Sequence, residues 1–131
     1  YSLSGRVIYG QGLGRQWGIP TANICMLRRV SPVQGIFCVQ VRRANGELLQ
    51  GVASLGTRPT VGGEGNILEV HLFDFNENLY GELIQVIFLH ALRDEVEFSS
   101  VEDLIKQIHC DIDQAKKYFK RKQQWLSTKI L

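Results

Sequence analysis

The spacing of apolar residues changes once along this chain, and that change limits the possible folds more than any other feature. As far as about residue 90, apolar and polar residues alternate in short runs that end at Gly, Asn or Pro, which is typical of strands joined by tight turns. Over residues 101–119 the apolar positions recur at three- and four-residue steps instead, which predicts one amphipathic helix. Ser99 with Glu102, or Ser100 with Asp103, would begin that helix with a capping box.

Five segments show the strand pattern clearly. In the second of them Phe37, Val39 and Val41 share one face, and Asn45-Gly46 follows as a strong hairpin signal. Glycines and a proline indicate loops over residues 56–60 and around 62–65. The expected strands are residues 5–9, 36–42, about 48–55, 67–75 and 83–89. Five or six consecutive short antiparallel strands favour a small closed barrel over a sandwich, with the helix covering one side or end.

The length of 131 residues is that of one domain, with the barrel over about residues 4–92 and the helix over about 100–122. A hydrophobic content of 44% and a charged content of 21% argue against disorder. No apolar run is long enough to span a bilayer, and no signal peptide is visible, so we expect no membrane contact. Cys25, Cys38 and Cys110 are widely spaced without a CxxC pair, which favours reduced core cysteines in a cytoplasmic protein.

The net charge is only +2, and most of the positive excess lies near the end of the chain. The basic residues there are Lys116, Lys117, Lys120, Arg121, Lys122 and Lys129. Such a run can bind nucleic acid, but more often it is the solvated face of a helix. The modest net charge and the lack of aromatic residues among the basic ones argue against a nucleic-acid-binding barrel.

A glycine-rich stretch over residues 10–23 is the first candidate site. Its glycines at positions 10, 12, 14 and 18 allow sharp turns, and successive backbone N–H groups in such a turn can bind an anion. Thr21 and Asn23 add oxygen ligands of the kind that Mg²⁺ accepts beside phosphates. The alternative is an ordinary turn, because the spacing fits neither a P-loop nor a Rossmann fingerprint.

Glu69 is the second candidate, because it is the one carboxylate in the middle of an otherwise apolar strand. Alternation places Glu69, His71, Phe73 and Phe75 on one face and Leu68, Val70, Leu72 and Asp74 on the other. A carboxylate on a barrel wall is costly to bury unless it is paired or used, whereas an outward-facing Glu would need no explanation. Arg93 and Glu95 before Phe98 could fix a planar ligand or form a surface ion pair.

Four segments, in this order, together resemble the riboflavin kinase family, and more narrowly the kinase module of bacterial bifunctional riboflavin kinase/FMN adenylyltransferases. They are Gly18-Ile19-Pro20-Thr21-Ala22-Asn23, Gly56-Thr57-Arg58-Pro59-Thr60, residues 68–75 with Leu79-Tyr80-Gly81, and residues 92–98. The resemblance implies a closed six-stranded antiparallel β-barrel with a long C-terminal helix. It also implies transfer of the γ-phosphate of ATP to the ribityl 5′-hydroxyl of riboflavin, which gives FMN and ADP.

The resemblance also assigns roles to residues. Glu69 would be the catalytic carboxylate, and Thr21 and Asn23 would lie at a divalent metal, usually Mg²⁺, with Mn²⁺ or Zn²⁺ as other options. Residues assigned to the ATP phosphates are Gly12, Gly14, Arg15, Gly18, Pro20 and Thr21. Residues assigned to the flavin are Arg93, Glu95 and Phe98.

Bacterial members of the family usually carry an N-terminal FMN adenylyltransferase domain, and this chain has no His-x-Gly-His motif. We therefore expect the kinase reaction without FAD synthesis, from an excised domain or a stand-alone protein. The alternative function is a barrel that binds flavin or nucleotide without catalysis. The joint presence of Thr21, Asn23 and Glu69 argues against it, because a binding module needs no base.

Overall fold

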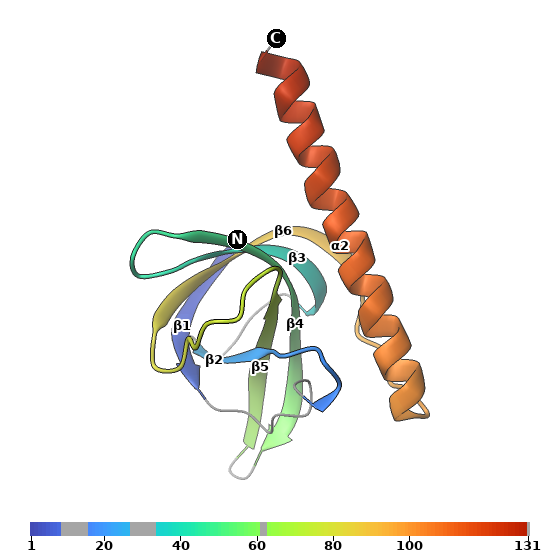
Figure 1. Ribbon diagram of the computed structural model, residues 1–131. Coiled ribbons are helices and arrows are strands. Elements are labelled where there is room, and N and C mark those ends of the chain that lie inside the picture. The colour runs from blue at the N-terminus through green and yellow to red at the C-terminus, as the bar shows by residue number, and fades with distance from the viewer. Residues whose placement is uncertain (9–15, 27–33, 61–62, 131) are drawn as a thin grey trace.

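Six strands close into one antiparallel β-barrel, and a long helix lies against its outer side (Figure 1). The computed structural model describes residues 1–8, 16–26, 34–60 and 63–130. Around the barrel the strands follow the order β1-β2-β5-β4-β3-β6. The elements are β1 (Ser2–Ile8), β2 (Ala22–Met26), β3 (Gly35–Arg42), β4 (Leu48–Thr60), β5 (Gly63–Leu72), β6 (Leu83–Arg93) and α2 (Val101–Ile130). The predicted fold class is thereby confirmed.

Alternate residues of the strands point into the barrel and form its apolar core. Phe37, Val39 and Val41 of β3 point inward, as their alternation predicts. The buried interior consists of Leu3, Val7, Ile24, Phe37, Val39, Val41, Ala53, Leu55, Leu68, Val70, Leu72, Leu79, Ile84 and Val86. Because successive side chains of a strand point to opposite faces, the outer face carries the helix contacts and the polar side chains.

Two segments predicted as loops are strand. Residues 56–60 extend β4 and residues 63–65 begin β5, with Gly56 opposite Ile67 and Thr60 opposite Gly63. Pairing along this long hairpin overrides the glycine and proline content, since β-propensity depends strongly on context. The sixth strand, β2, begins at the end of the glycine-rich stretch, and its apolar pattern is too short to mark it as a strand.

The predicted strand 67–75 ends early, at Leu72. Asp74 has a φ of 53°, in the left-handed region, so the strict alternation stops there. Phe73 packs beneath α2, whereas Phe75 packs against the barrel interior. The prediction that Phe73 and Phe75 share a face with Glu69 is therefore wrong for Phe75.

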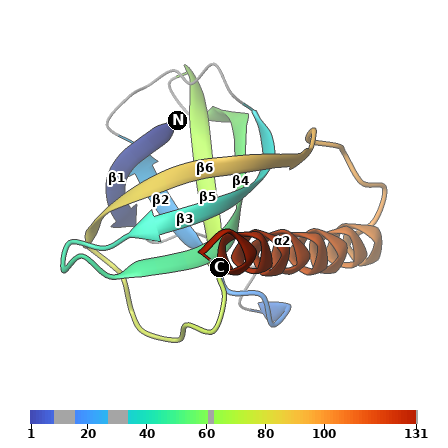
Figure 2. The same ribbon diagram turned by 90° about the horizontal axis from the view of Figure 1, so that it is seen from above.

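Helix α2 covers the outer face of β3, β4 and β6, and it lies beside the barrel when seen from above (Figure 2). The Ser100 hydroxyl accepts a hydrogen bond from the Asp103 backbone N–H at 3.1 Å, so the second expected capping pair forms. Between helix and barrel lies a second apolar cluster: Ile19, Ile36, Cys38, Val52, Ile112, Ala115 and Phe119. Val101, predicted to be on the apolar face, is exposed.

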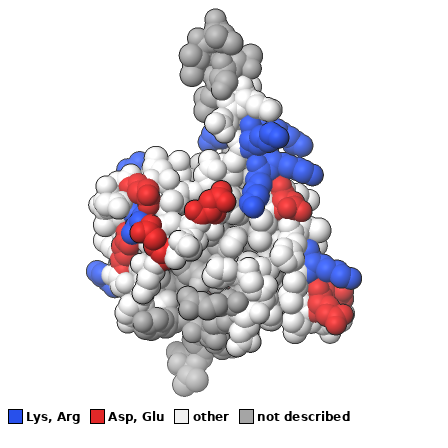
Figure 3. Space-filling model, in the orientation of Figure 1, with Lys and Arg blue, Asp and Glu red and all other residues white. Residues whose placement is uncertain are grey.

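The helix continues beyond its expected end near residue 122 and reaches Ile130. Its last turns project past the barrel (Figure 1). Figure 3 shows Lys and Arg side chains gathered along this part of the molecule. Lys116, Lys117, Lys120, Arg121 and Lys122 are all exposed there, as a solvated helix face would be.

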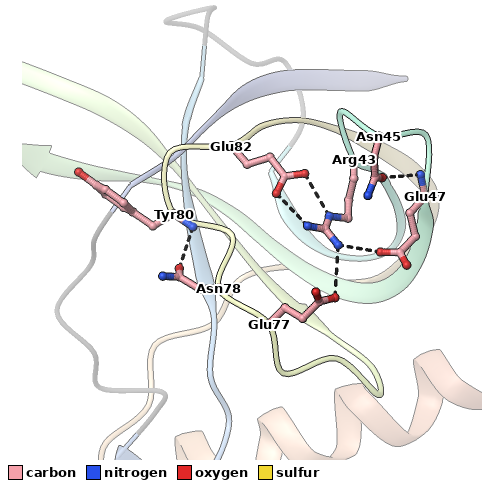
Figure 4. Close-up of polar contacts among 7 residues, drawn as sticks. All are labelled: Arg43, Asn45, Glu47, Glu77, Asn78, Tyr80 and Glu82. Atoms are coloured by element: carbon pink, nitrogen blue, oxygen red, sulfur yellow. Dashed lines mark hydrogen bonds and ion pairs between the residues drawn. The ribbon is translucent and has the colours of Figure 1, made fainter.

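The far end of the β3–β4 hairpin is held by a cluster around Arg43 (Figure 4). Its guanidinium donates to both carboxylate oxygens of Glu82, at 3.0 and 3.1 Å, and forms ion pairs with Glu47 at 2.9 Å and Glu77 at 3.3 Å. Hydrogen bonds from Arg43 lower the pKa of Glu82, and those to Glu82 and Glu47 raise the pKa of Arg43. Glu77 and Glu82 flank the turn before β6, so the cluster joins two turns.

The three cysteines are free, but they do not share one environment. Cys38 is fully buried beneath α2, and burial raises the pKa of its thiol to about 11. Cys25 and Cys110 are exposed, so the prediction of core cysteines is right for Cys38 and wrong for the other two. Among the residues described, no helix has both the length and the apolar character needed to cross a membrane.

Candidate active site

A row of polar side chains crosses the outer face of the barrel on β2, β5 and β4. Asn23 lies directly opposite Glu69, and Glu69 lies directly opposite Ser54. Their strand neighbours Ile24 and Leu68 are buried in the barrel, so these three side chains point outward. Directly paired residues have Cβ atoms about 5 Å apart, which brings the three polar groups within reach of one small ligand.

The segment before Asn23 is fixed by apolar anchors on alternate sides. Ile19 is buried in the cluster beneath α2, and Ala22 packs against the barrel interior. The Pro20 carbonyl lies 2.8 Å from Nδ1 of His71, which joins the segment to β5. Thr21 is therefore left exposed, on the same side of β2 as Asn23.

Gly18 turns the chain into this segment with a φ of 76°, a conformation that glycine adopts without strain. No atom of the described residues lies within 4 Å of a Cβ built there, and the positive φ is what favours the glycine. The predicted phosphate ligands Gly12, Gly14 and Arg15 lie outside the described residues. Of that predicted set, Gly18, Pro20 and Thr21 are described, and they lead directly into the polar row.

Glu69 is half-buried on the outward face of β5. It is thus an outward-facing Glu, as the simpler interpretation of the strand pattern required, and its cross-strand neighbours are the polar residues Asn23 and Ser54. Within the described residues, no hydrogen bond or ion pair ties down its carboxylate.

The oxygen atoms of the polar row and of the adjacent Thr21 belong to hydroxyl, amide and carboxylate groups. Thr21, Asn23 and Glu69 present hard oxygens, which suit Mg²⁺ better than they suit a soft, thiolate-binding ion. The described residues contain no group of three or more His, Cys, Asp or Glu side chains that could hold a metal by themselves. Oxygen ligands of these three kinds suit a hard divalent cation.

Arg93, predicted together with Phe98 to contact flavin, joins the end of β6 to helix α2. The Arg93 guanidinium donates two hydrogen bonds to Asp111, Nε to Oδ1 at 2.9 Å and Nη2 to Oδ2 at 2.7 Å. Its Cζ atom lies over the Phe98 ring, 5.8 Å from the ring centroid, and Nη1 donates to the Asp94 carbonyl. A flavin contact by Arg93 and Phe98 stays a prediction, whereas their role in holding this segment is visible.

Asp111 was missed as a partner of Arg93. It is 3% exposed, and it also accepts a hydrogen bond from Gln107 one helical turn earlier. The signal in the sequence was its position, because residues 108, 112 and 115 on either side of it are apolar-face residues. A carboxylate at the edge of a buried helix face requires a cation on the neighbouring element.

Comparison with known families identifies the family of this chain. The family model described as riboflavin kinase (Flavokinase) matches residues 1–119. The chain belongs to the riboflavin kinase family. The polar row on the barrel wall therefore belongs to a riboflavin kinase domain. Family membership supports an ATP-dependent kinase that acts on riboflavin.

The chain is similar to members of the family that are longer than itself. It is 49% identical to the bifunctional riboflavin kinase/FMN adenylyltransferase of Haemophilus influenzae, over 91% of this chain and 39% of that protein. The chain thus spans about two fifths of this relative's length.

Two solved structures share the fold. A protein titled a macrolide-efflux protein, from Streptococcus pneumoniae, superposes with a TM-score of 0.76 and 37% identity, over 84% of this chain and 36% of that one. The riboflavin kinase of Trypanosoma brucei superposes with a TM-score of 0.60 and 21% identity, over 93% and 81%. At that identity, the second likeness supports the fold alone.

Proposed function

We propose that this chain transfers the γ-phosphate of ATP to the ribityl 5′-hydroxyl of riboflavin, giving FMN and ADP. The observation that carries the proposal is the pairing of Asn23 and Glu69 on one outward face, with Thr21 beside Asn23. In this arrangement Glu69 can act as a base next to Thr21 and Asn23, which can bind phosphate. Phosphoryl transfer asks the protein mainly for alignment and charge stabilisation, and a rigid barrel wall supplies both.

In the proposed reaction, Glu69 accepts the proton of the ribityl hydroxyl as its oxygen attacks the γ-phosphorus. The new O–P bond forms while the bond from the γ-phosphorus to the β,γ-bridging oxygen breaks. That oxygen leaves with the electron pair as part of ADP. Thr21 and Asn23 orient the phosphate groups, and the segment after β6 orients riboflavin beside Glu69.

We propose Mg²⁺ as the metal, held by Thr21 and Asn23 together with the substrate phosphates. When bound, it would neutralise charge on the phosphate oxygens. Mn²⁺ and Zn²⁺ are the alternatives, and of the three Mg²⁺ best matches the hydroxyl and amide oxygens of the row.

A chromatographic assay tests the function. Riboflavin, ATP, MgCl₂ and the chain are incubated, and FMN and FAD are measured separately. We expect FMN that depends on both ATP and the metal, and no FAD. Flavin fluorescence quenched by the protein without FMN formation would instead support the non-catalytic binding module.

Replacing Glu69 tests the proposed base. Glu69→Gln keeps the size and outward position of the side chain but cannot accept the proton. We expect kcat to fall by roughly 10²-fold or more, as loss of a general base does, with an unchanged Tm and unchanged ATP affinity. Turnover close to wild type in the Gln variant would remove Glu69 from the chemical step.

Replacing Thr21 or Asn23 tests the proposed phosphate and metal ligands. Thr21→Ala and Asn23→Ala should each weaken Mg·ATP binding by about tenfold, the cost of one charge-assisted contact. The affinity is measured by calorimetry with and without MgCl₂. Asn76→Ala is the matched control, because Asn76 is an exposed turn residue away from the row. Unchanged Mg·ATP affinity in both site variants would refute the assignment.

The expected covalent partner is an FMN adenylyltransferase domain, which the name of the Haemophilus influenzae relative supports. FAD formation by a longer form of the protein, but not by this chain, would agree with that expectation. A cytoplasmic location, where ATP and reduced cysteines prevail, completes the proposal.

A further inference from the structure

Gly56 of β4 lies beneath a carboxylate that comes from a distant part of the chain. A Cβ atom added at Gly56 would overlap both carboxylate oxygens of Glu95. Gly56 has no positive φ, so its conformation does not require glycine. Gly56 is buried although its Cα–H faces outward, since Glu95 covers it. The missing side chain is therefore what lets Glu95 approach the strand.

Ser54, two residues earlier on the same face of β4, holds the same carboxylate. Its hydroxyl donates a hydrogen bond to Oε1 of Glu95 at 3.4 Å. Ser54 is also the direct cross-strand neighbour of Glu69. The place where Glu95 docks is thus the end of the polar row formed by Asn23, Glu69 and Ser54.

The segment that carries Glu95 connects the end of β6 to the start of α2. Residues 94–97 are exposed and belong to neither strand nor helix. The segment is anchored at its start by the contacts of Arg93 with Asp111 and at its end by the cap of α2. Between these anchors, Asp94 lies close to Gly35 of β3, and Glu95 contacts Ser54 and Gly56 of β4.

We infer that Gly56 and Ser54 are positioning residues, which hold Glu95 and thereby fix the 94–97 segment beside Glu69 for riboflavin binding. This inference rests on the proposed kinase function. It also gives a reason for the glycine of Gly56-Thr57-Arg58-Pro59-Thr60. A segment held in its binding conformation before substrate arrives loses less entropy on binding, so its release should weaken riboflavin affinity.

A double-mutant cycle tests the inference. Gly56→Ala displaces Glu95 by steric overlap, and Glu95→Ala removes the displaced group. Each single variant should raise the KM for riboflavin about fivefold, from lost preorganisation, with little change in kcat or in the KM for ATP. The double variant should be no worse than either single variant, because both changes break one contact.

The cycle separates positioning from simple damage to β4. If Gly56→Ala raised the riboflavin KM equally with and without Glu95, or lowered kcat and Tm in both backgrounds, the inference would be overturned. A wild-type chain that forms no FMN would refute the proposed function instead. In that case the dissociation constant of riboflavin, measured by fluorescence quenching, replaces KM in the double-mutant cycle. An equal effect of Gly56→Ala with and without Glu95 would again overturn the inference.

Two further variants sharpen the result. Glu95→Gln keeps an acceptor oxygen for Ser54, so it should remain within about twofold of the wild-type KM if the contact acts by position. A loss as large as that of Glu95→Ala would show that the negative charge itself acts, against the inference. Glu102→Ala is the control for removing an exposed carboxylate nearby, and it should change neither KM.

Discussion

Arg43 and Arg93 lie at opposite ends of the β3–β6 pair, and the same kinds of residue, carboxylates and a phenylalanine, surround both. Each guanidinium lies over a phenylalanine ring, Phe75 at 5.4 Å for Arg43 and Phe98 at 5.8 Å for Arg93. Among the described residues, Arg43 pairs with three carboxylates and Arg93 pairs with one, that of Asp111. The two sites differ in how far water reaches those partners.

The partners of Arg43 are open to water, with side-chain exposures of 20%, 46% and 62% for Glu82, Glu47 and Glu77. The Asp111 side chain is 5% exposed. Exposed ion pairs contribute little because solvent screens them, whereas a pair whose carboxylate is out of reach of water is screened less. The ion pair of Arg93 with Asp111 should therefore contribute more to stability than the three ion pairs of Arg43.

The largest expected effect is that of Asp111→Ala. It removes both hydrogen bonds to Arg93 and the one from Gln107, and it should lower the free energy of unfolding by about 3 kcal/mol. Urea denaturation followed by circular dichroism measures this change. Asp113→Ala, two positions along the same helix and exposed, should cost almost nothing. An equal loss of unfolding free energy in the two variants would show that the burial of Asp111 does not set its contribution.

Glu82→Gln should have a smaller, pH-dependent effect. Arg43 lowers the pKa of Glu82 below its usual 4.5, mainly by hydrogen bonding. A folded-state pKa below the unfolded one means that the contribution is complete above pH 4.5 and is lost as the pH falls through the folded value. The variant should melt about 3 °C below wild type at pH 7.

The same variant and wild type should converge in Tm as the solution becomes strongly acid, since both then carry a neutral side chain at position 82. Melting curves from neutral pH to well below pH 4.5 test this. A difference that stayed constant over that range would mean that Glu82 acts by shape rather than by charge.

The sequence predicted the barrel because its evidence was local. Alternation in β3 and the Asn45-Gly46 turn identify a hairpin without knowledge of the rest of the chain. Strand β2 and the far ends of β4 and β5 were missed because they depend on partners distant in sequence. Gly56 and Gly63 have low β-propensity, yet each is paired across the β4–β5 hairpin. The amino-acid composition of the segment does not reveal that pairing.

The candidate site divides in the same way. Thr21, Asn23 and Glu69 could be named from short motifs, and the strand register places Asn23 opposite Glu69. The partnership of Arg93 with Asp111, and that of Gly56 with Glu95, joins segments 18 and 39 positions apart. Such contacts follow from how α2 and the segment before it lie on the barrel, which the spacing of residues does not specify.

The smallest expected effect, that of Glu77→Gln, is the strictest test of the comparison. Glu77 is the most exposed partner of Arg43 and the most distant, at 3.3 Å, and Glu47 and Glu82 remain in place when its charge is removed. The variant should change Tm by less than about 1 °C, because a screened pair contributes little and the guanidinium keeps its shorter contacts. Differential scanning calorimetry at low and high salt resolves such a shift. A larger loss that disappears at high salt would mean that the three carboxylates act on Arg43 as one network, and that counting contacts, rather than burial, explains this end of the barrel.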